Sequence, residues 1–419
     1  MSQRCESCLP IQGPAYGELQ EITILVCLNT YINNTEMIIP EKFDEIRPFT
    51  PEEMPTVIER LFADPQFLGV VKTLFPNVPT EVVKQQALAC KTPLEFQKNI
   101  IKGIVNGIMQ KASKGFTMEA PALDREASHT FVSNHRDIVL DSALLDVLLI
   151  DNDFRTTCEI AIGDNLLKLT WVKDIVRLNK SFIVQRGLPM RQMLQASKTL
   201  AEYMHFAIAE KHENIWIAQR EGRAKDSDDR TAEAILKMMT MGGEGSVIDR
   251  LKSLHIVPLA ISYEYDPCDF LKAKEFQQRR DSDDFKKGSQ DDIISMKTGI
   301  IGYKGRIHYH AATSIDAYLS TLPTDMSKAE LYTAIAEYID KEIHKRYHLY
   351  ANNYVALDLL NGKTEFADRY SAEEKVAFEK YLDGQIAKID LPNKDEYFLR
   401  NRILTMYANP AINYLKAND

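Results

Sequence analysis

Short apolar segments alternate with helical patterns from residue 116 onward, and this alternation constrains the fold more than any other feature of the sequence. The strand candidates are HTFVSN (129–134), SFIVQR (181–186), NIWIAQR (214–220), HIVPLAISYEY (255–265) and RIHYHAATSI (306–315). Helical segments lie between them, such as DSALLDVLLI and the long stretch that begins at Pro189. This order predicts an α/β domain with a mostly parallel sheet flanked by helices.

Helical patterns flank the predicted α/β domain on both sides. The segment PEEMPTVIERLF begins with proline and acids, as helix N-termini prefer. We predict an extension over residues 1–40 that need not be well ordered, a helical domain over 41–115, the α/β domain over 116–325 and a helical C-terminal region over 326–419. Met37 stands just before the first clearly patterned segment and is a second candidate for the natural start.

Composition limits the class of protein. The longest apolar runs, such as residues 22–28, fall short of the roughly 18–20 residues that a membrane-spanning helix needs. The N-terminus lacks the apolar segment of a signal peptide, so we expect a cytoplasmic protein. A net charge of −9 argues against a general nucleic-acid binder. The six cysteines are scattered as in reduced intracellular proteins, and the pair Cys5 and Cys8 has no second pair nearby.

The segment FVSNHRDIVLDS carries the strongest chemical signal. An apolar strand runs into Asn134, His135 and Arg136, and a helix follows directly. Ligands bind at such strand ends in α/β sheets, and an imidazole there can act as a general base. Asp137 or Asp141 could hold that imidazole in the right tautomer. A protein-kinase interpretation of H-R-D is disfavoured, because no glycine-rich loop precedes it and no D-F-G follows.

Three further strand candidates end in polar residues suited to an anionic acceptor: SFIVQRGLPMR, IAQREGRAKD and VPLAISYEYDPCD. In order and spacing, the four blocks together resemble the four motifs of the glycerolipid acyltransferases, the family of glycerol-3-phosphate and lysophosphatidic acid acyltransferases. The resemblance covers about residues 130–270. It makes His135 the catalytic base with Asp141 or Asp137 as its partner. The substrate-binding residues that it implies are Asn134, Arg186, Arg220, Glu221, Gly222, Arg223, Lys225 and Pro258.

Two departures from the family pattern keep alternatives open. Asp141 lies six residues after His135, whereas the family usually has five. In the third block Arg223 follows Gly222 directly, without the usual intervening residue. The phosphate ligand there can therefore be Arg223, Arg220 or Lys225.

The resemblance implies an O-acyltransferase of phospholipid biosynthesis that transfers a fatty acyl group from an acyl thioester to the hydroxyl of 1-acylglycerol-3-phosphate. The expected partners are acyl-CoA or acyl carrier protein as donor and a lipid phosphate as acceptor, with no cofactor beyond the donor. Peripheral contact with the inner face of the plasma membrane fits such an acceptor. Glycerol-3-phosphate, or an acylated amino acid, is an alternative acceptor. An acyl-ester hydrolase is disfavoured because no G-x-S-x-G motif occurs, and a non-catalytic lipid-binding protein would not need the His and acid.

Other candidate features receive ordinary structural interpretations. His344 and His348 have metal-ligand spacing on a predicted helix, and His308 and His310 share a strand face, but the sequence shows no third ligand for either pair. We therefore assign no metal ligand. The apolar stripe over residues 100–109 could lie on a membrane, although packing against the protein is the more common use of such a helix.

Overall fold

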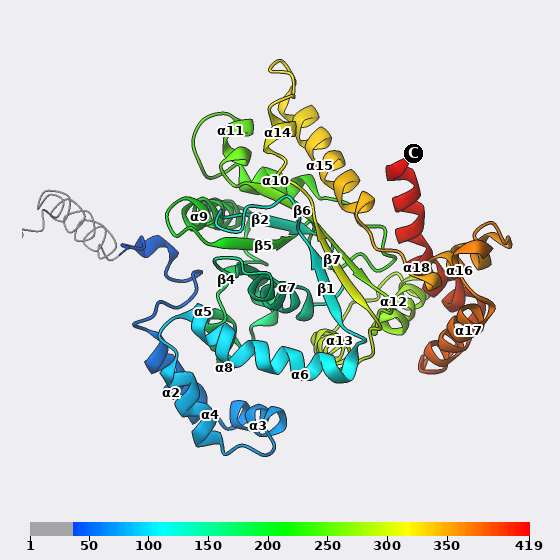
Figure 1. Ribbon diagram of the computed structural model, residues 1–419, viewed down its shortest axis with the longest axis horizontal. Coiled ribbons are helices and arrows are strands. Elements are labelled where there is room, and N and C mark those ends of the chain that lie inside the picture. The colour runs from blue at the N-terminus through cyan, green and yellow to red at the C-terminus, as the bar shows by residue number, and fades with distance from the viewer. Residues whose placement is uncertain (1–36) are drawn as a thin grey trace, which may run out of the picture. The chain divides into compact units, whose positions relative to one another are not determined.

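The computed structural model describes residues 37–419, and residues 42–419 form one compact unit within it (Figure 1). Cys5, Cys8 and residues 22–28 lie outside the described residues, so the hypotheses about them are not addressed. None of the described helices is long and apolar enough to cross a bilayer.

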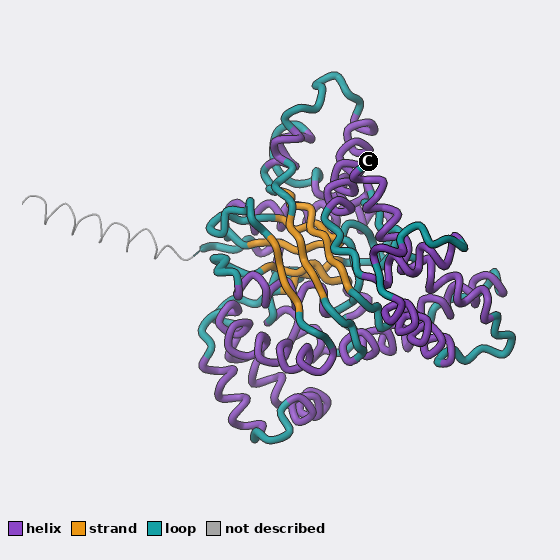
Figure 2. The backbone as a smooth tube through the Cα atoms, turned by 45° about the vertical axis from the view of Figure 1, so that its right-hand side comes forward, coloured by secondary structure: helices purple, strands orange, loops and turns teal. Residues whose placement is uncertain are grey.

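Seven strands in the described part of the chain form one sheet, in the order β1-β7-β6-β2-β5-β3-β4. Neighbouring strands are parallel except β6 and β7, which are antiparallel. The α/β class with a mostly parallel sheet is therefore confirmed, and Figure 2 shows the strands surrounded by helices. The strands are β1 (Phe116–Glu119), β2 (Thr130–Ser133), β3 (Cys158–Gly163), β4 (Ser181–Val184), β5 (Asn214–Ala218), β6 (Ile256–Tyr263) and β7 (Ile307–Ala311).

Two of these strands, β1 and β3, were not predicted from the sequence. β1 is a four-residue edge strand in which alternate residues are exposed, so it has no apolar run. In β3 the apolar run is interrupted by Glu159, which is buried and accepts hydrogen bonds from Tyr203 and Lys211. Both strands are identified by their pairing with distant strands rather than by local pattern.

Helices precede, cover and follow the sheet, and the predicted N-terminal and C-terminal helices are confirmed. A π-helical turn, Gln97–Ile101, joins α5 and α6, and short 3₁₀ turns occur at Asp164–Leu166 and Ala367–Arg369. The division into four domains stays a prediction. The helices are α2 (Met54–Ala63), α3 (Pro65–Leu74), α4 (Thr80–Ala89), α5 (Pro93–Phe96), α6 (Lys102–Ala112), α7 (Leu140–Asp151), α8 (Thr170–Leu178), α9 (Met190–Ala209), α10 (Glu233–Met239), α11 (Val247–Lys252), α12 (Asp269–Asp281), α13 (Ser289–Ile301), α14 (Asp316–Leu319), α15 (Lys328–Lys345), α16 (Ala351–Asn361), α17 (Ala372–Ala387) and α18 (Glu396–Asn418).

Helices α6 and α7 pack on one face of the sheet. Val105 and Met109 of α6 share a buried cluster with Leu144 of α7 and with Phe131 and Tyr309 of the sheet. The apolar stripe of α6 therefore packs against the protein. The first helices, α2 to α4, share a separate apolar cluster with α8, and the last helices share another with α12.

The direction of the strands fixes where a site can form. Strands β2, β3, β4, β5 and β6 run parallel through their successive pairings, so their carboxyl ends meet at one edge of the sheet. Ligands bind outside this edge in open α/β sheets.

Candidate active site

His135 lies two residues beyond the end of β2 and forms a hydrogen bond with an acid. Its Nδ1 is 2.8 Å from Oδ2 of Asp141, and the imidazole is largely buried with 13% of its surface exposed. The Trp216 ring on the neighbouring strand β5 packs edge-on against the imidazole, at 5.7 Å between ring centres. When Nδ1–H donates this hydrogen bond to the carboxylate, Nε2 keeps its lone pair. Nε2 has no hydrogen-bond partner among the described residues. The geometry is that of a positioned general base.

Asp141 is fully buried and lies in the first turn of α7. The same Oδ2 accepts hydrogen bonds from the backbone N–H groups of Arg136 and Asp137, at 2.6 and 3.0 Å. Side chains of a helix tilt toward its N-terminus, so a first-turn carboxylate points back at the preceding turn. The N-terminal end of the helix also favours negative charge there.

Asp137, the other candidate partner of His135, has a different position. Its Oδ1 accepts from the backbone N–H groups of Val139 and Leu140, which closes the turn before α7. Burial, and then the nearby Asp141 carboxylate, raise the pKa of Asp137. The carboxylate that contacts His135 is therefore that of Asp141.

The Arg136 side chain lies in a buried polar network. Its Nη2 is 2.8 Å from Oδ2 of Asp229, which also accepts from the Tyr347 hydroxyl at 2.8 Å. Burial acts to lower the pKa of Arg136, but the acidic groups around it, Asp229 first among them, together outweigh burial and raise that pKa. This ion pair joins the turn after β2 to the loop before α10. Asp229 was not predicted from the sequence, because no local pattern distinguishes it.

Arg186 lies two residues beyond the end of β4, and its Nη1 is 3.1 Å from Oε1 of Glu221, which follows β5. The arginine is 36% exposed and the glutamate 79% exposed, so both can reach a ligand in solvent. The backbone N–H of Arg186 donates to Asp164 at the end of β3. Two predicted substrate-binding residues thus meet at the edge of the sheet that also carries His135.

Gly163, the last residue of β3, makes room for Arg186. A Cβ atom there would lie 2.9 Å from Nε of Arg186 and 2.5 Å from the Asn165 side chain. This glycine was not predicted from the sequence, because its contact with Arg186 depends on which strand lies beside β3.

The loop after β5 carries the remaining charged candidates. Gly222 adopts a left-handed conformation with φ 68°, which glycine accepts without strain. Lys225 forms an ion pair with Glu275 of α12, and burial lowers the pKa of Lys225. Arg220 and Arg223 are half-buried, and Nη1 of Arg223 has no hydrogen-bond partner among the described residues. Arg220, Arg223 and Lys225 were the three candidate phosphate ligands in this loop. Lys225 is the least suited of them, because Glu275 already neutralises its charge.

Asn134, directly after β2, and Pro258, within β6, are both buried. The Asn134 side chain donates to the carbonyl of Ile261 at 2.9 Å and accepts from its N–H at 2.8 Å. Pro258 is buried in β6 and is paired with Val132 of β2. Neither side chain offers a free polar group to a substrate, so we do not carry Asn134 or Pro258 into the proposed site.

Unpaired polar atoms gather near the carboxyl ends of the strands. Both amide atoms of Gln219, the residue after β5, are buried without a hydrogen-bond partner among the described residues, as is Nη1 of Arg136. Buried polar groups are normally hydrogen-bonded, and exceptions often mark functional sites. Gln219 is therefore a further candidate that the sequence did not suggest.

Comparison with known proteins assigns this part of the chain. The family model described as Acyltransferase matches residues 121–262, a range that contains His135, Asp141, Arg186 and the loop after β5. This part of the chain belongs to the acyltransferase family. No curated protein matches the sequence. A solved structure, the 1-acyl-sn-glycerophosphate (LPA) acyltransferase PlsC from Thermotoga maritima, is 11% identical, with a TM-score of 0.35, over 69% of this chain and 92% of that chain.

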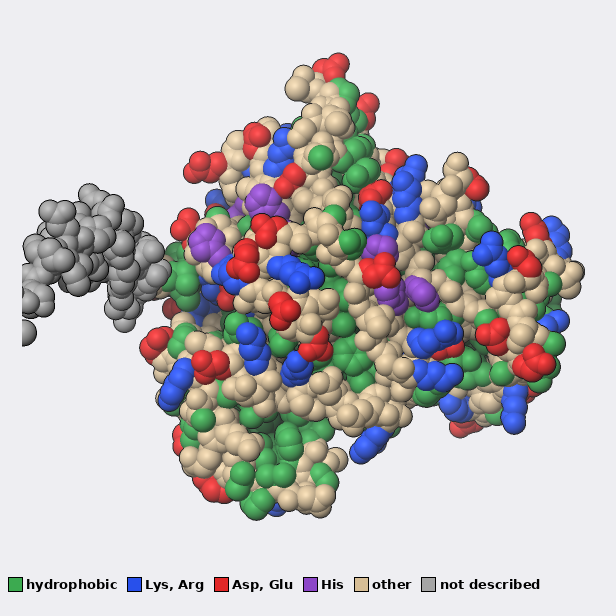
Figure 3. All heavy atoms as spheres, in the orientation of Figure 1, with side chains coloured by type: hydrophobic (Ala, Val, Ile, Leu, Met, Phe, Trp, Pro, Cys, Tyr) green, Lys and Arg blue, Asp and Glu red, His purple; other side chains and the backbone are tan. Residues whose placement is uncertain are grey.

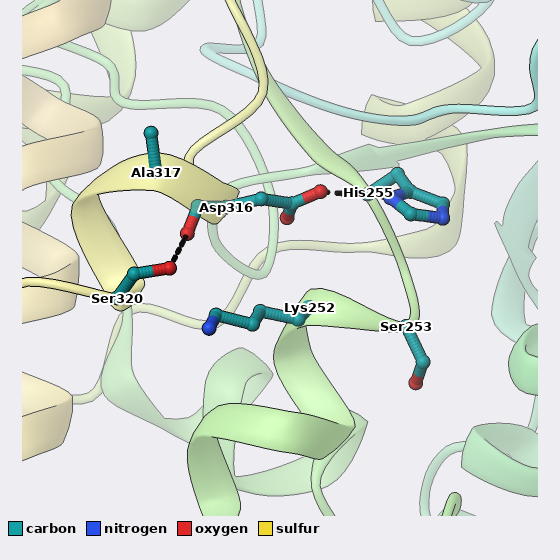
Figure 4. Close-up of a pocket in the computed structure, with 6 residues that line it drawn as sticks. All are labelled: Lys252, Ser253, His255, Asp316, Ala317 and Ser320. Carbon is teal, nitrogen blue, oxygen red and sulfur yellow. Dashed lines mark hydrogen bonds and ion pairs between the residues drawn. The ribbon is translucent and has the colours of Figure 1, made fainter.

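A hollow at the opposite edge of the sheet is separate from the site of the acyltransferase domain. It is lined by Lys252, Ser253, His255, Asp316, Ala317 and Ser320. Figure 4 shows Asp316 pointing to His255, whose Nδ1 lies 2.8 Å from the carboxylate. His255 precedes β6, whereas His135 follows the parallel neighbour β2, so the two histidines lie at opposite ends of these strands.

Proposed function

We propose that the protein transfers a fatty acyl group from an acyl thioester, carried by coenzyme A or acyl carrier protein, to the hydroxyl of 1-acylglycerol-3-phosphate. The observation that carries this proposal is the hydrogen bond between His135 Nδ1 and Asp141, which leaves Nε2 free at the carboxyl edge of the sheet. The matched acyltransferase family supports the reaction class. The acceptor is inferred from the charges and apolar side chains around the site.

The proposed chemistry is a single transfer without a covalent enzyme intermediate. Nε2 of His135 takes the proton of the acceptor hydroxyl while the hydroxyl oxygen bonds to the thioester carbonyl carbon. The resulting oxyanion needs hydrogen-bond donors, for which we propose backbone N–H groups near Glu221 and Gly222. When the carbon–sulfur bond breaks, His135 returns the proton to the leaving thiolate, and Asp141 stabilises the imidazolium between the two steps.

Arginine side chains supply the proposed phosphate site. Arg186 is partly exposed, and its contact with Glu221 is a surface ion pair that an incoming phosphate can displace at small cost. A guanidinium suits a phosphate because it offers paired donors and a permanent charge. Arg223 can add to this site, since its Nη1 is unpaired among the described residues.

Exposed apolar side chains beside Arg186 support an acceptor that carries a fatty chain. Helix α9 begins four residues after Arg186, and its first turns expose Met190 (85%), Leu194 (64%) and Met193 (43%). Contiguous exposed apolar groups mark ligand or membrane contact sites. They favour a lysophospholipid over glycerol-3-phosphate, and they suit peripheral contact with the cytoplasmic face of a membrane.

The test is an acceptor panel assayed with the full chain. Acyl-CoA and acyl carrier protein thioesters would each be incubated with 1-acylglycerol-3-phosphate, glycerol-3-phosphate, an N-acyl amino acid or no acceptor, and products separated by chromatography. We expect phosphatidate from the first acceptor, formed at least about 100-fold more slowly by the His135→Ala variant. Product from glycerol-3-phosphate alone would overturn the lysophospholipid assignment, and free fatty acid without lipid product would indicate a hydrolase.

A further inference from the structure

Two histidines and a glutamate from neighbouring strands meet on the face of the sheet opposite α6 and α7. His310 of β7 is paired with Glu119 of the parallel strand β1, and His308 is paired with Thr117. Alternate residues of a strand share a face, so all four side chains lie on one side of the sheet, while Tyr309 between the histidines lies on the other. One ligand atom from each of Glu119, His308 and His310 lies within 4.8 Å of the other two. The sequence showed only the two histidines, because Glu119 is about 190 residues away.

The orientation of His308 is fixed by a hydrogen bond behind it. Its Nδ1 is 2.9 Å from the Thr117 hydroxyl, so Nε2 faces Glu119, whose Oε1 lies 3.6 Å away. On the other side, Nδ1 of His310 lies 3.8 Å from Oε2 of Glu119. Metal-bound histidines usually have their second ring nitrogen held in this way by a neighbouring group.

The cluster has a path from solvent on one side. The His308 side chain is 10% exposed, that of His310 is 28% exposed and that of Glu119 is 61% exposed. Figure 3 shows histidine side chains gathered beside acidic ones on the viewed face, right of its centre. A third histidine, His348, lies 5.0 Å from His308 between ring centres.

We propose that Glu119, His308 and His310 bind a divalent transition-metal ion of the zinc class, in a site separate from the acyl-transfer site. Two imidazoles and one carboxylate suit Zn²⁺ and its neighbours, whereas Mg²⁺ and Ca²⁺ prefer oxygen ligands alone. With zinc–ligand bonds of about 2.0–2.2 Å, tetrahedral ligand atoms lie roughly 3.3–3.5 Å apart. The two Glu119–histidine separations of 3.6 and 3.8 Å are close to this spacing, and the exposed Glu119 side chain is free to move toward both rings.

A metal ion bound here would link the edge strand β1 to its neighbour β7 and stabilise that edge of the sheet. β1 has only four residues and pairs with β7 alone, so an ion held by both strands adds a link that the backbone ladder does not supply. An ion that binds the folded state and not the unfolded chain stabilises the fold in proportion to the logarithm of its concentration.

The experiment is a titration of the metal-free full chain with Co²⁺ and then Zn²⁺. Cys5 and Cys8 would be changed to serine in every sample, so that this C-x-x-C pair binds no ion. We expect one equivalent of Co²⁺ to give visible d–d absorption, Zn²⁺ to displace it, and a large excess of Mg²⁺ to leave it unchanged. His310→Ala should weaken Co²⁺ binding by more than tenfold. His212 is exposed and is not part of the cluster, so His212→Asn should leave Co²⁺ binding unchanged. Equal affinity in His310→Ala and His212→Asn would overturn the proposal.

Two milder variants keep the test independent of folding defects. Glu119→Gln alters an exposed side chain, so the metal-free protein should melt as the unchanged chain does, but the rise in melting temperature with Zn²⁺ should be lost. Thr117→Val removes the group that holds His308, and we expect about a 10-fold loss of zinc affinity. A full zinc-dependent rise in melting temperature for Glu119→Gln would count against the site. None of these measurements uses acyl transfer, so the metal site and the proposed function succeed or fail separately.

Discussion

The Arg186 guanidinium occupies the space that a side chain at residue 163 would need. A Cβ at Gly163 would lie 2.9 Å from its Nε and 3.1 Å from its Cζ. The two residues lie at the ends of the neighbouring parallel strands β3 and β4, so the fold of the sheet, rather than the loop itself, positions the arginine beside Glu221.

Gly163→Ala should therefore raise the acceptor KM in the same direction as Arg186→Ala, but by less. Because Arg186 is proposed to bind the acceptor phosphate, Arg186→Ala should raise the acceptor KM, by about 10- to 100-fold for the loss of a charged hydrogen-bond pair worth roughly 1.5–3 kcal/mol. Gly163→Ala displaces the guanidinium without removing it and should raise KM by less. Initial rates against acceptor concentration measure both, with donor KM as the internal control. An unchanged acceptor KM in Arg186→Ala would remove this residue from the site.

His135→Ala should reduce kcat by about 100- to 10,000-fold, the usual contribution of a general base. The imidazole is only 13% exposed, so circular dichroism and thermal melting must show that the fold is retained. His212→Asn serves as the matched control and should keep full turnover. Wild-type turnover by a folded His135→Ala protein would contradict the proposed mechanism.

Asp141→Asn should also reduce turnover strongly, because an amide at this position can stabilise the wrong imidazole tautomer. We expect a loss of up to about 10⁴-fold in kcat. Asp137→Asn should affect stability more than kcat, since Asp137 contacts backbone N–H groups and not His135. A larger kcat loss in Asp137→Asn than in Asp141→Asn would reverse the two roles.

Arg136→Ala should destabilise the protein by about 3–5 kcal/mol, since it leaves the buried carboxylate of Asp229 without its countercharge. Urea unfolding followed by fluorescence measures the free energy of unfolding. The double variant Arg136→Leu with Asp229→Asn removes both charges and should be more stable than Arg136→Ala. A loss below about 1 kcal/mol, the range of surface ion pairs, would show that the pair is not buried as described.

The His255–Asp316 pair predicts a small pH dependence of stability. The hydrogen bond to Asp316 raises the pKa of His255 above the ordinary histidine value in the folded protein. A raised folded pKa contributes stability that is present below the unfolded pKa of about 6.5 and is lost as pH rises through the folded value. His255 is half exposed, so the effect should stay below about 1 kcal/mol. Asp316→Asn should lower the His255 pKa in an NMR titration and should cost more stability at pH 5.5 than at pH 8.5; an equal cost at both would contradict this.

Sequence patterns predicted the class of the fold because most of its strands are apolar runs bounded by polar residues. They also identified His135, since a histidine directly after such a strand is a local feature. They left Asp137 and Asp141 as alternatives, because the choice depends on where α7 begins: with the helix starting at Leu140, Asp141 falls in its first turn and points back to the imidazole.

Long-range contacts account for what the sequence could not supply. Glu119 meets His308 and His310 only because β1 pairs with β7, and Arg136 meets Asp229 across about 90 residues. Asn134 was predicted to bind substrate, but its side chain bonds to the backbone of β6. In each case the partner is determined by strand order, which local periodicity does not encode.

The Asn134 amide has a consequence for the imidazole beside it. The Asn134 side chain forms the same two hydrogen bonds with the Ile261 backbone that a peptide group of β2 would form. It therefore extends the hydrogen bonding between β2 and β6 by one residue. The main chain is thereby released from hydrogen bonding to β6 one residue before His135 and can turn outward there. The turn that carries the His135 imidazole is thus anchored to the neighbouring strand through the side chain of the residue before it.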